Sequence, residues 1–421
     1  MSEAHFDEEI HEDEEFIDPE SALDVIQDDE EDKLMSDLSD DDQEEVEDEV
    51  IELSNNSTTY FDKHTDSIFL IATHPTLPLA LSGGGDDTGY VWTTHSVPPK
   101  FVTQLSGHTD SLVTGGWSPD GEWLITGGMD GQVRIWRARS RGQKWEFVDS
   151  LKEVEEVTWI AFHPTQPIFA FGANDGSVWV YALSPKIESL SVLYAHSEAT
   201  TAGAFIPASA LGNASVENPE DEEINLLTVS EDGSLISWSI PTGVQNYRIG
   251  PQQFHFETPW ISLSLHPSGT SAAIGSSDGK LSIVGVRTGS IIASLDVLEA
   301  TGKSDTPDEE KSVEGISWSD TMGVLAVGLV AGVVCIFDTG SWRVRRTLEV
   351  GEPVTKVASL PGTTEVVSSA MDGIVRKWDV RSGEEIWRGT GHSSGILGFA
   401  LADSGKTLIT ASDEGVSLIY K

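Results

Sequence analysis

The chain contains 421 residues, of which 38% are hydrophobic, so it is long enough to bury a large core. Its formal net charge at pH 7 is −45, from 25 Lys and Arg residues against 70 Asp and Glu residues. Nucleic acids and anionic membrane surfaces attract basic proteins, so this charge argues against both as partners and favours a basic protein.

The cysteine content and the lack of long apolar runs predict an intracellular protein. Cys335 is the single cysteine, which rules out an intramolecular disulfide and fits a reducing compartment. The sequence contains no run of 18 apolar residues, and its first residues do not resemble a signal peptide. We therefore expect a soluble cytoplasmic monomer, with entry into the nucleus left open.

An acidic segment spans residues 1–53, where 26 Asp and Glu residues stand against one base, Lys33. Dense like charge, few aromatic residues and no periodic apolar pattern predict a disordered tail over residues 1–56. Two roles stay open for it: a solubilising tail, or a mobile polyanion that shields a basic partner. Ser36 and Ser39 precede acidic residues and so resemble sites of acidophilic kinases.

A turn followed by a strand recurs along the rest of the chain. Residues 127–136 show the pattern: Asp-Gly favours a turn, and Val133, Ile135 and Trp136 favour a buried strand. The Asp position of this unit recurs at Asp86, Asp130, Asp175, Asp232, Asp278, Ala331, Asp372 and Glu414. A period of roughly 40–45 residues with an aromatic residue closing the strand is typical of WD40 blades. We predict an all-β fold, a single eight-bladed WD40 β-propeller over residues 57–421.

The last repeat ends directly after its third strand and so lacks an outer strand. Thr58-Thr59-Tyr60-Phe61 precedes the first repeat and has no partner within it. We expect this segment to supply the missing strand, because pairing the two termini closes the ring and leaves no exposed sheet edge. Two long spacings contain residues 208–223 and 298–312, which are polar and predict loops outside the blade core.

No residue pattern indicates catalysis or a cofactor. The histidines lie at the start of repeats or in His-Pro turns, where a structural role is expected: His64, His74, His108, His163, His196, His266 and His392. No Cys/His spacing suggests zinc, and no nucleophile motif is present. We therefore expect a protein that is not an enzyme and that binds no metal or cofactor.

Acidic residues recur near one position of the repeat, two residues before the first strand of a blade. In a propeller, the loop at this position faces one end of the ring, the top. The candidates are Asp66, Asp110, Glu155, Glu156, Glu198, Glu257, Glu314 and Glu352. In the eighth repeat this position holds Ser394, which is not acidic. One interpretation of this recurrence is that it has no functional meaning, because acidic residues favour exposed turns in any acid-rich chain. The other is a ring of carboxylates at one mouth that binds a cationic peptide.

Several runs of the sequence also carry a resemblance to a known family. They are residues 54–67 (SNNSTTYFDKHTDS), 153–157 (EVEEV), 171–179 (FGANDGSVW), 259–265 (PWISLSL), 341–345 (SWRVR) and 413–418 (DEGVSL). The chain resembles the fungal Sqt ribosome-assembly proteins, which are related to the animal angio-associated migratory cell protein, over about residues 54–420.

The resemblance implies an eight-bladed propeller and a dedicated chaperone in assembly of the 60S ribosomal subunit. It further implies capture of the basic N-terminus of a nascent large-subunit ribosomal protein, the eukaryotic counterpart of bacterial L-sixteen, on an acidic propeller face. The matching acidic positions are Asp66, Asp110, Glu155, Glu156 and Glu314. A WD40 scaffold or histone-binding propeller for another basic partner would use the same fold and charge, so that alternative stays open.

Overall fold

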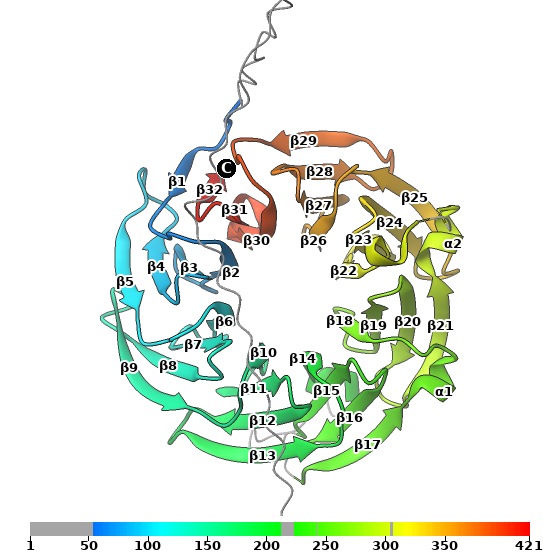
Figure 1. Ribbon diagram of the computed structural model, residues 1–421, viewed down its shortest axis with the longest axis horizontal. Coiled ribbons are helices and arrows are strands. Elements are labelled where there is room, and N and C mark those ends of the chain that lie inside the picture. The colour runs from blue at the N-terminus through cyan, green and yellow to red at the C-terminus, as the bar shows by residue number, and fades with distance from the viewer. Residues whose placement is uncertain (1–53, 212–222, 241, 304–305) are drawn as a thin grey trace, which may run out of the picture. The chain divides into compact units, whose positions relative to one another are not determined.

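The computed structural model describes residues 54–211, 223–240, 242–303 and 306–421. These residues form eight four-stranded antiparallel sheets, each of which is one blade of a ring (Figure 1). The predicted eight-bladed β-propeller is confirmed. The disorder predicted for residues 1–56 concerns a segment that lies outside the described residues, apart from residues 54–56.

The first four blades follow the chain in order. Blade 1 contains β2 (Ile68–Thr73), β3 (Leu79–Gly84), β4 (Gly89–Thr93) and β5 (Phe101–Leu105). Blade 2 contains β6 (Leu112–Trp117), β7 (Trp123–Gly128), β8 (Val133–Arg139) and β9 (Lys144–Leu151). Blade 3 contains β10 (Val157–Phe162), β11 (Ile168–Ala173), β12 (Ser177–Ala182) and β13 (Glu188–Tyr194). Blade 4 contains β14 (Thr200–Ile206), β15 (Asn225–Ser230), β16 (Leu235–Ser239) and β17 (Val244–Ile249).

The last four blades repeat this order, and the eighth takes its fourth strand from the start of the chain. Blade 5 contains β18 (Trp260–Leu265), β19 (Ser271–Ser276), β20 (Lys280–Gly285) and β21 (Ser290–Asp296). Blade 6 contains β22 (Val313–Trp318), β23 (Val324–Leu329), β24 (Val333–Asp338) and β25 (Val344–Glu349). Blade 7 contains β26 (Val354–Ser359), β27 (Glu365–Ala370), β28 (Val375–Asp379) and β29 (Glu385–Gly389). Blade 8 contains β30 (Ile396–Ala402), β31 (Thr407–Ser412), β32 (Ser417–Tyr420) and β1 (Thr59–Phe61).

The first strand of each blade lies nearest the centre of the ring, and the fourth lies at its perimeter (Figure 1). The top is the end at which these first strands begin, and the bottom is the opposite end. The core lies between neighbouring blades. For example, the fully buried Val133 and Ile135 of blade 2 pack with Val157, Phe169 and Phe171 of blade 3. Such burial of both sheet faces stabilises a propeller through the hydrophobic effect.

The predicted closure of the ring is confirmed. β1 pairs antiparallel with β32, with Thr59 opposite Ile419 and Phe61 opposite Ser417. Phe61 is 4% exposed and stacks on the closing Trp92 of blade 1, with 4.7 Å between ring centroids. The N-terminal strand therefore completes blade 8 and also contributes to the core between blades 8 and 1.

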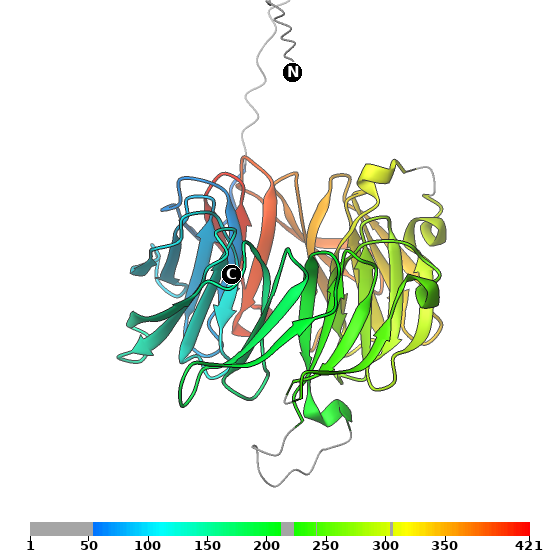
Figure 2. The same ribbon diagram turned by 60° about the horizontal axis from the view of Figure 1, so that its bottom comes forward.

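The prediction of a loop over residues 298–312 is wrong in part, since helix α2 (Val297–Thr301) begins there and η3 (Asp308–Glu310) follows. Asp296 caps α2, and Val297 and Leu298 are buried in the core shared by blades 5 and 6. The other long spacing contains η1 (Ala208–Leu211), while residues 212–222 lie outside the described residues. In Figure 2 the loop between β21 and β22, drawn in yellow-green and yellow, and the green η1 lie at opposite ends of the ring.

Two short helical segments remain. Helix α1 (Pro251–Phe254) joins blades 4 and 5 at the top and buries Phe254 against Trp260. It was missed because its four residues are too few to show a helical period. The segment η4 (Asp403–Gly405) joins the first two strands of blade 8 at the bottom.

Candidate functional site

A buried polar network fastens the top of several blades. In blade 1, His64 Nδ1 lies 3.0 Å from Asp86 Oδ1, and His64 Nε2 lies 2.9 Å from Ser82 Oγ. The closing Trp92 donates from Nε1 to the same hydroxyl at 3.1 Å. The histidine of the opening loop is thus tied to the Asp turn and to the Trp strand, so the histidine, Asp and Trp signals of the repeat have a structural explanation.

Blades 2, 4 and 8 build the same contact from equivalent residues. The pairs are His108 with Asp130, His196 with Asp232, and His392 with Glu414, in which a glutamate replaces the aspartate. Burial lowers the pKa of His64, His108 and His392, although their carboxylate partners oppose the shift. These histidines are therefore neutral at pH 7.

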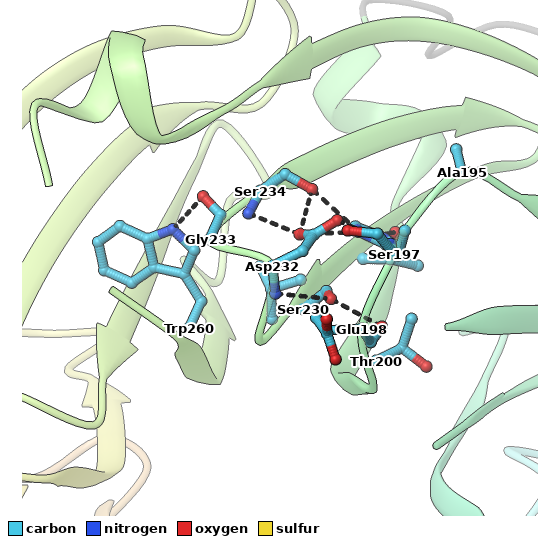
Figure 3. Close-up of polar contacts among 12 residues, drawn as sticks. Ala195, Ser197, Glu198, Thr200, Ser230, Asp232, Gly233, Ser234 and Trp260 are labelled. Carbon is cyan, nitrogen blue, oxygen red and sulfur yellow. Dashed lines mark hydrogen bonds and ion pairs between the residues drawn. The ribbon is translucent and has the colours of Figure 1, made fainter. Parts of the chain in front are cut away.

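Asp232 shows how such a turn holds its carboxylate (Figure 3). Ser234 donates from Oγ at 2.6 Å and from its amide at 2.9 Å, and the Ser197 amide donates at 3.1 Å. Burial acts to raise the pKa of Asp232, but hydrogen bonds from His196 and Ser234 outweigh it and hold that pKa well below its ordinary value. Asp232 therefore stays ionised, and hydrogen-bond donors of its own blade stabilise its charge.

In several repeats the glycine of the turn lies against the acidic loop before the next blade. A Cβ on Gly131 would lie 2.4 Å from the Glu155 carbonyl oxygen, and one on Gly176 would lie 2.8 Å from that of Glu198. A Cβ on Gly415 of blade 8 would likewise lie too close to the carbonyl oxygen of Asp66, in the loop before blade 1. These glycines have φ between 68° and 82°, which L side chains rarely adopt. Contacts of one kind thus place the acidic loops at equivalent points around the top.

The structure brings five candidates to this position: Asp66, Asp110, Glu155, Glu198 and Glu352. All five side chains are exposed, and the neighbouring Glu156 is half-buried. The equivalent residue of blade 5 is the buried Thr258, so the exposed Glu257 lies one residue farther from the strand. In blade 6 the equivalent residue is Lys311, which pairs with Asp308. The acidic ring is therefore interrupted at blades 5, 6 and 8.

Glu314 lies in a different setting from the loop candidates. It is the second residue of β22, exposed between the buried Val313 and Gly315, and Ser312 Oγ donates to its carboxylate at 2.6 Å. Glu314 is the one carboxylate on the eight first strands of the described blades. It therefore adds a negative charge to the innermost layer of strands, next to the loops that carry the other candidates.

Among the described residues, the eight candidate carboxylates have no cationic partner. None forms an ion pair with a Lys, Arg or His side chain within the part of the chain that the structure describes. Asp66 and Asp110 each accept a 2.7 Å bond from the next backbone amide, which leaves their charge in place. Like charges gathered at one end of a ring attract a cationic ligand.

Two further acids at the top were missed. Glu231 and Asp413 each directly precede the acidic residue of a repeat turn. Asp413 of blade 8 accepts a 2.6 Å bond from the Ser67 hydroxyl of blade 1, so it lies beside the Asp66 loop. Aligning the repeats on the turn and reading the residue before it would have found both.

The top of the described propeller is characterised by exposed carboxylates. Across the described ranges, no group of three or more His, Cys, Asp or Glu side chains is arranged to hold a metal ion. In the same residues, no helix combines the length and the apolar character needed to cross a membrane. The fold and the site together define an eight-bladed WD40-type propeller whose top is rimmed by unpaired carboxylates.

Comparisons with known proteins place this propeller in a family. The chain matches the family described as WD domain, G-beta repeat over residues 99–137, and the family described as Nucleolar protein 10-like, N-terminal domain over residues 224–420. It is 36% identical to the ribosome assembly protein SQT1 of Saccharomyces cerevisiae, over 93% of this chain and 91% of that protein. The chain belongs to the Sqt1 family of ribosome assembly proteins.

Other relatives and solved structures agree. The human angio-associated migratory cell protein is 25% identical, over 87% of this chain and 80% of that protein. The crystal structure of Saccharomyces cerevisiae Sqt1 superposes with a TM-score of 0.80, covering 88% of this chain and 99% of that chain. Chaetomium thermophilum Sqt1 bound to the N-terminus of ribosomal protein L10 superposes with a TM-score of 0.75 at 29% identity, over 87% and 100% of the two chains.

Proposed function

We propose that this protein is a dedicated chaperone in assembly of the 60S ribosomal subunit, and that its top captures the basic N-terminal segment of a large-subunit ribosomal protein. The observation that carries the proposal is the set of exposed carboxylates at the top that form no ion pair with any described Lys, Arg or His side chain. A relative with the same fold has been solved with the N-terminus of ribosomal protein L10. The proposed client of this chain is the protein that corresponds to bacterial L-sixteen.

The binding energy would come from charge-assisted hydrogen bonds between client Arg or Lys side chains and these carboxylates. Such bonds contribute about 1.5–3 kcal/mol each where they are partly desolvated, and much less where they stay exposed. Several contacts along an extended peptide would therefore be needed for tight capture. The function requires binding and no chemical step, which fits a non-enzymatic role in the cytoplasm, where the client is synthesised.

Charge reversal at the top tests the proposal. Asp110→Lys or Glu314→Lys removes an attraction and adds a repulsion, so each should weaken binding of a synthetic client N-terminal peptide by about tenfold or more, or 1.4 kcal/mol, in calorimetry. The matched control is Glu384→Lys, an exposed glutamate in the β28–β29 turn at the bottom. If the control abolishes binding while both top reversals leave it unchanged, the binding surface is at the other end.

The identity of the client needs a separate experiment. Affinity purification of the full chain from its own cells, followed by mass spectrometry, should recover one large-subunit ribosomal protein in a salt-sensitive complex. Recovery of histones instead would favour the alternative of a histone-binding propeller, which has the same fold and charge requirements.

A further inference from the structure

A hollow with a volume of about 550 Å³ lies at the top, between blades 4 and 5. Its walls come from the β15–β16 turn, the end of β17, helix α1 and the loop that leads into β18. Three of its lining residues are acids already described at the top: Glu231, Asp232 and Glu257. The hollow thus adjoins the proposed client-binding surface.

Hydrogen bonds between and within the two blades hold the turn and the loop that line the hollow (Figure 3). Trp260 of β18 donates from Nε1 to the Gly233 carbonyl at 2.9 Å. The buried Thr258 donates from Oγ1 to Asp278 at 2.5 Å. A Cβ on Gly233 would lie 3.0 Å from both Pro251 Cγ and the Thr258 carbonyl oxygen, so turn and loop are in close contact. A hollow fixed in this way needs little ordering when a ligand enters.

The outer wall is fixed as well. The Gly250 amide donates to Gln253 Oε1 at 3.0 Å and so holds the start of α1. At the end of α1, Phe254 is 1% exposed and packs edge-on against Trp260, with 4.9 Å between ring centroids. Pro251 and Pro259 add apolar surface to the lining.

The charge balance of the hollow favours a cation. Arg248 lines it, but this guanidinium is occupied: it donates to the Ala195 carbonyl at 3.0 Å and pairs with Asp232 at 3.3 Å. Glu231 and Glu257 are exposed and form no ion pair within the described residues. After Arg248 and Asp232 neutralise each other, two negative charges remain over apolar proline walls.

We propose that this hollow is an anchor subsite that receives one arginine side chain of the basic client segment. A planar guanidinium can contact two carboxylates at once through its fork of N–H groups, while its aliphatic stem and flat face pack on apolar surface. A lysine ammonium would gain the charge but not the forked geometry. The inference rests on the proposed client binding, and it adds that one arginine is recognised by shape as well as by charge.

Isosteric variants test the subsite by calorimetry with the synthetic client N-terminal peptide. Glu231→Gln and Glu257→Gln each remove one charge with little change of shape, and each should weaken binding three- to tenfold. The matched control is Glu299→Gln, an exposed glutamate of α2 that does not line the hollow, and it should leave the affinity within twofold. Equal affinities for wild type and both hollow variants, while Asp110→Lys still weakens binding, would overturn the subsite but not the proposed function.

A second variant tests shape without changing charge. Gln252→Trp places a large ring into the hollow from an exposed position on α1 and should weaken binding about tenfold. Its melting temperature, compared with wild type, checks that the fold persists. If a folded Gln252→Trp protein binds like wild type, the hollow is not occupied in the complex and the inference is wrong.

The identity of the anchor follows from replacing each peptide arginine by lysine in turn. One replacement should weaken binding to wild type but have at most a twofold effect in the Glu231→Gln, Glu257→Gln double variant, because the two changes then remove the same contact. The remaining replacements should act equally on both proteins. Equal effects at every position would contradict the proposal, and failure of the wild type to bind any peptide would reject both the subsite and the proposed function.

Discussion

Two sets of carboxylates lie at the top of this ring, and their surroundings give them opposite roles. The turn set consists of Asp86, Asp130, Asp232 and Glu414, whose side chains are 4–20% exposed. The rim set consists of the exposed Asp66, Asp110, Glu155, Glu198, Glu257, Glu314 and Glu352. Residue type is the same in both sets, so burial and the supply of donors decide which charges hold the fold together.

The turn set is surrounded by donors from its own blade. Hydrogen bonds from serine hydroxyls, backbone amides and histidines keep Asp130, Asp232 and Glu414 charged, and the pKa of each is lowered although burial acts against it. The rim set meets no cation within the described residues. The proposed client would supply cations to the rim set, whereas the charges of the turn set are already stabilised within the blade.

The largest expected effect comes from opening the ring on which both sets depend. Deleting residues 57–62 removes β1, exposes the edge of β32 and uncovers Trp92, which stacks on Phe61. Loss of one large buried side chain alone costs about 3–5 kcal/mol, so the melting temperature should drop by roughly 10 °C or more. Thermal unfolding followed by circular dichroism measures it, and an unchanged melt would show that the N-terminal strand is dispensable.

The next effect separates the two sets directly. Asp232→Ala leaves His196, Arg248 and two backbone amides without their acceptor and should cost about 3 kcal/mol of unfolding free energy. Glu198→Ala, at an exposed rim position of the same blade, should change it by less than about 0.5 kcal/mol. Denaturant titrations of the two variants check this. Similar losses in both would remove the distinction between turn and rim.

A smaller effect concerns pH. Burial lowers the pKa of His64, His108 and His392 in the folded state, so below about pH 6.5 the unfolded chain binds more protons than the folded one. This contribution to stability is complete above pH 6.5 and is lost as the pH falls. The denaturant midpoint should stay nearly constant from pH 7.5 to about pH 6.5 and then decrease down to pH 5.0. A constant midpoint over this range would show that these histidines are not buried in the neutral form.

The smallest effect is the response to salt. Raising the ionic strength from about 0.05 to 0.5 M screens exposed charges, so affinity for the client peptide should fall several-fold. The turn set is shielded from solvent, and its contribution to the melting temperature should change little over the same range. Calorimetry measures the affinity and melting curves measure the stability, both at the same series of salt concentrations. An affinity that does not respond to salt would argue against rim carboxylates as the binding groups.

The sequence by itself determined the fold and its closure. Asp-Gly turns, aromatic strand ends and a period near 40–45 residues are local signals that repeat, and repetition makes weak local signals strong. The role of the N-terminal strand followed from counting strands. The eighth repeat had only three, and the segment 58–61 belonged to no repeat. The recurrent acidic position was also visible in this way, since its spacing from the next strand is short.

The tertiary structure decided which residues share a surface. Sequence spacing could not show that Lys311 takes the acidic position in blade 6, or that Glu314 lies on a first strand instead of a loop. Nor could it bring Glu231 and Glu257 to one hollow, because that depends on a turn in blade 4 meeting a loop before blade 5 through Gly233 and Trp260. Repeats reveal each blade from local pattern, whereas contacts between blades depend on residues far apart in the chain that no local pattern records.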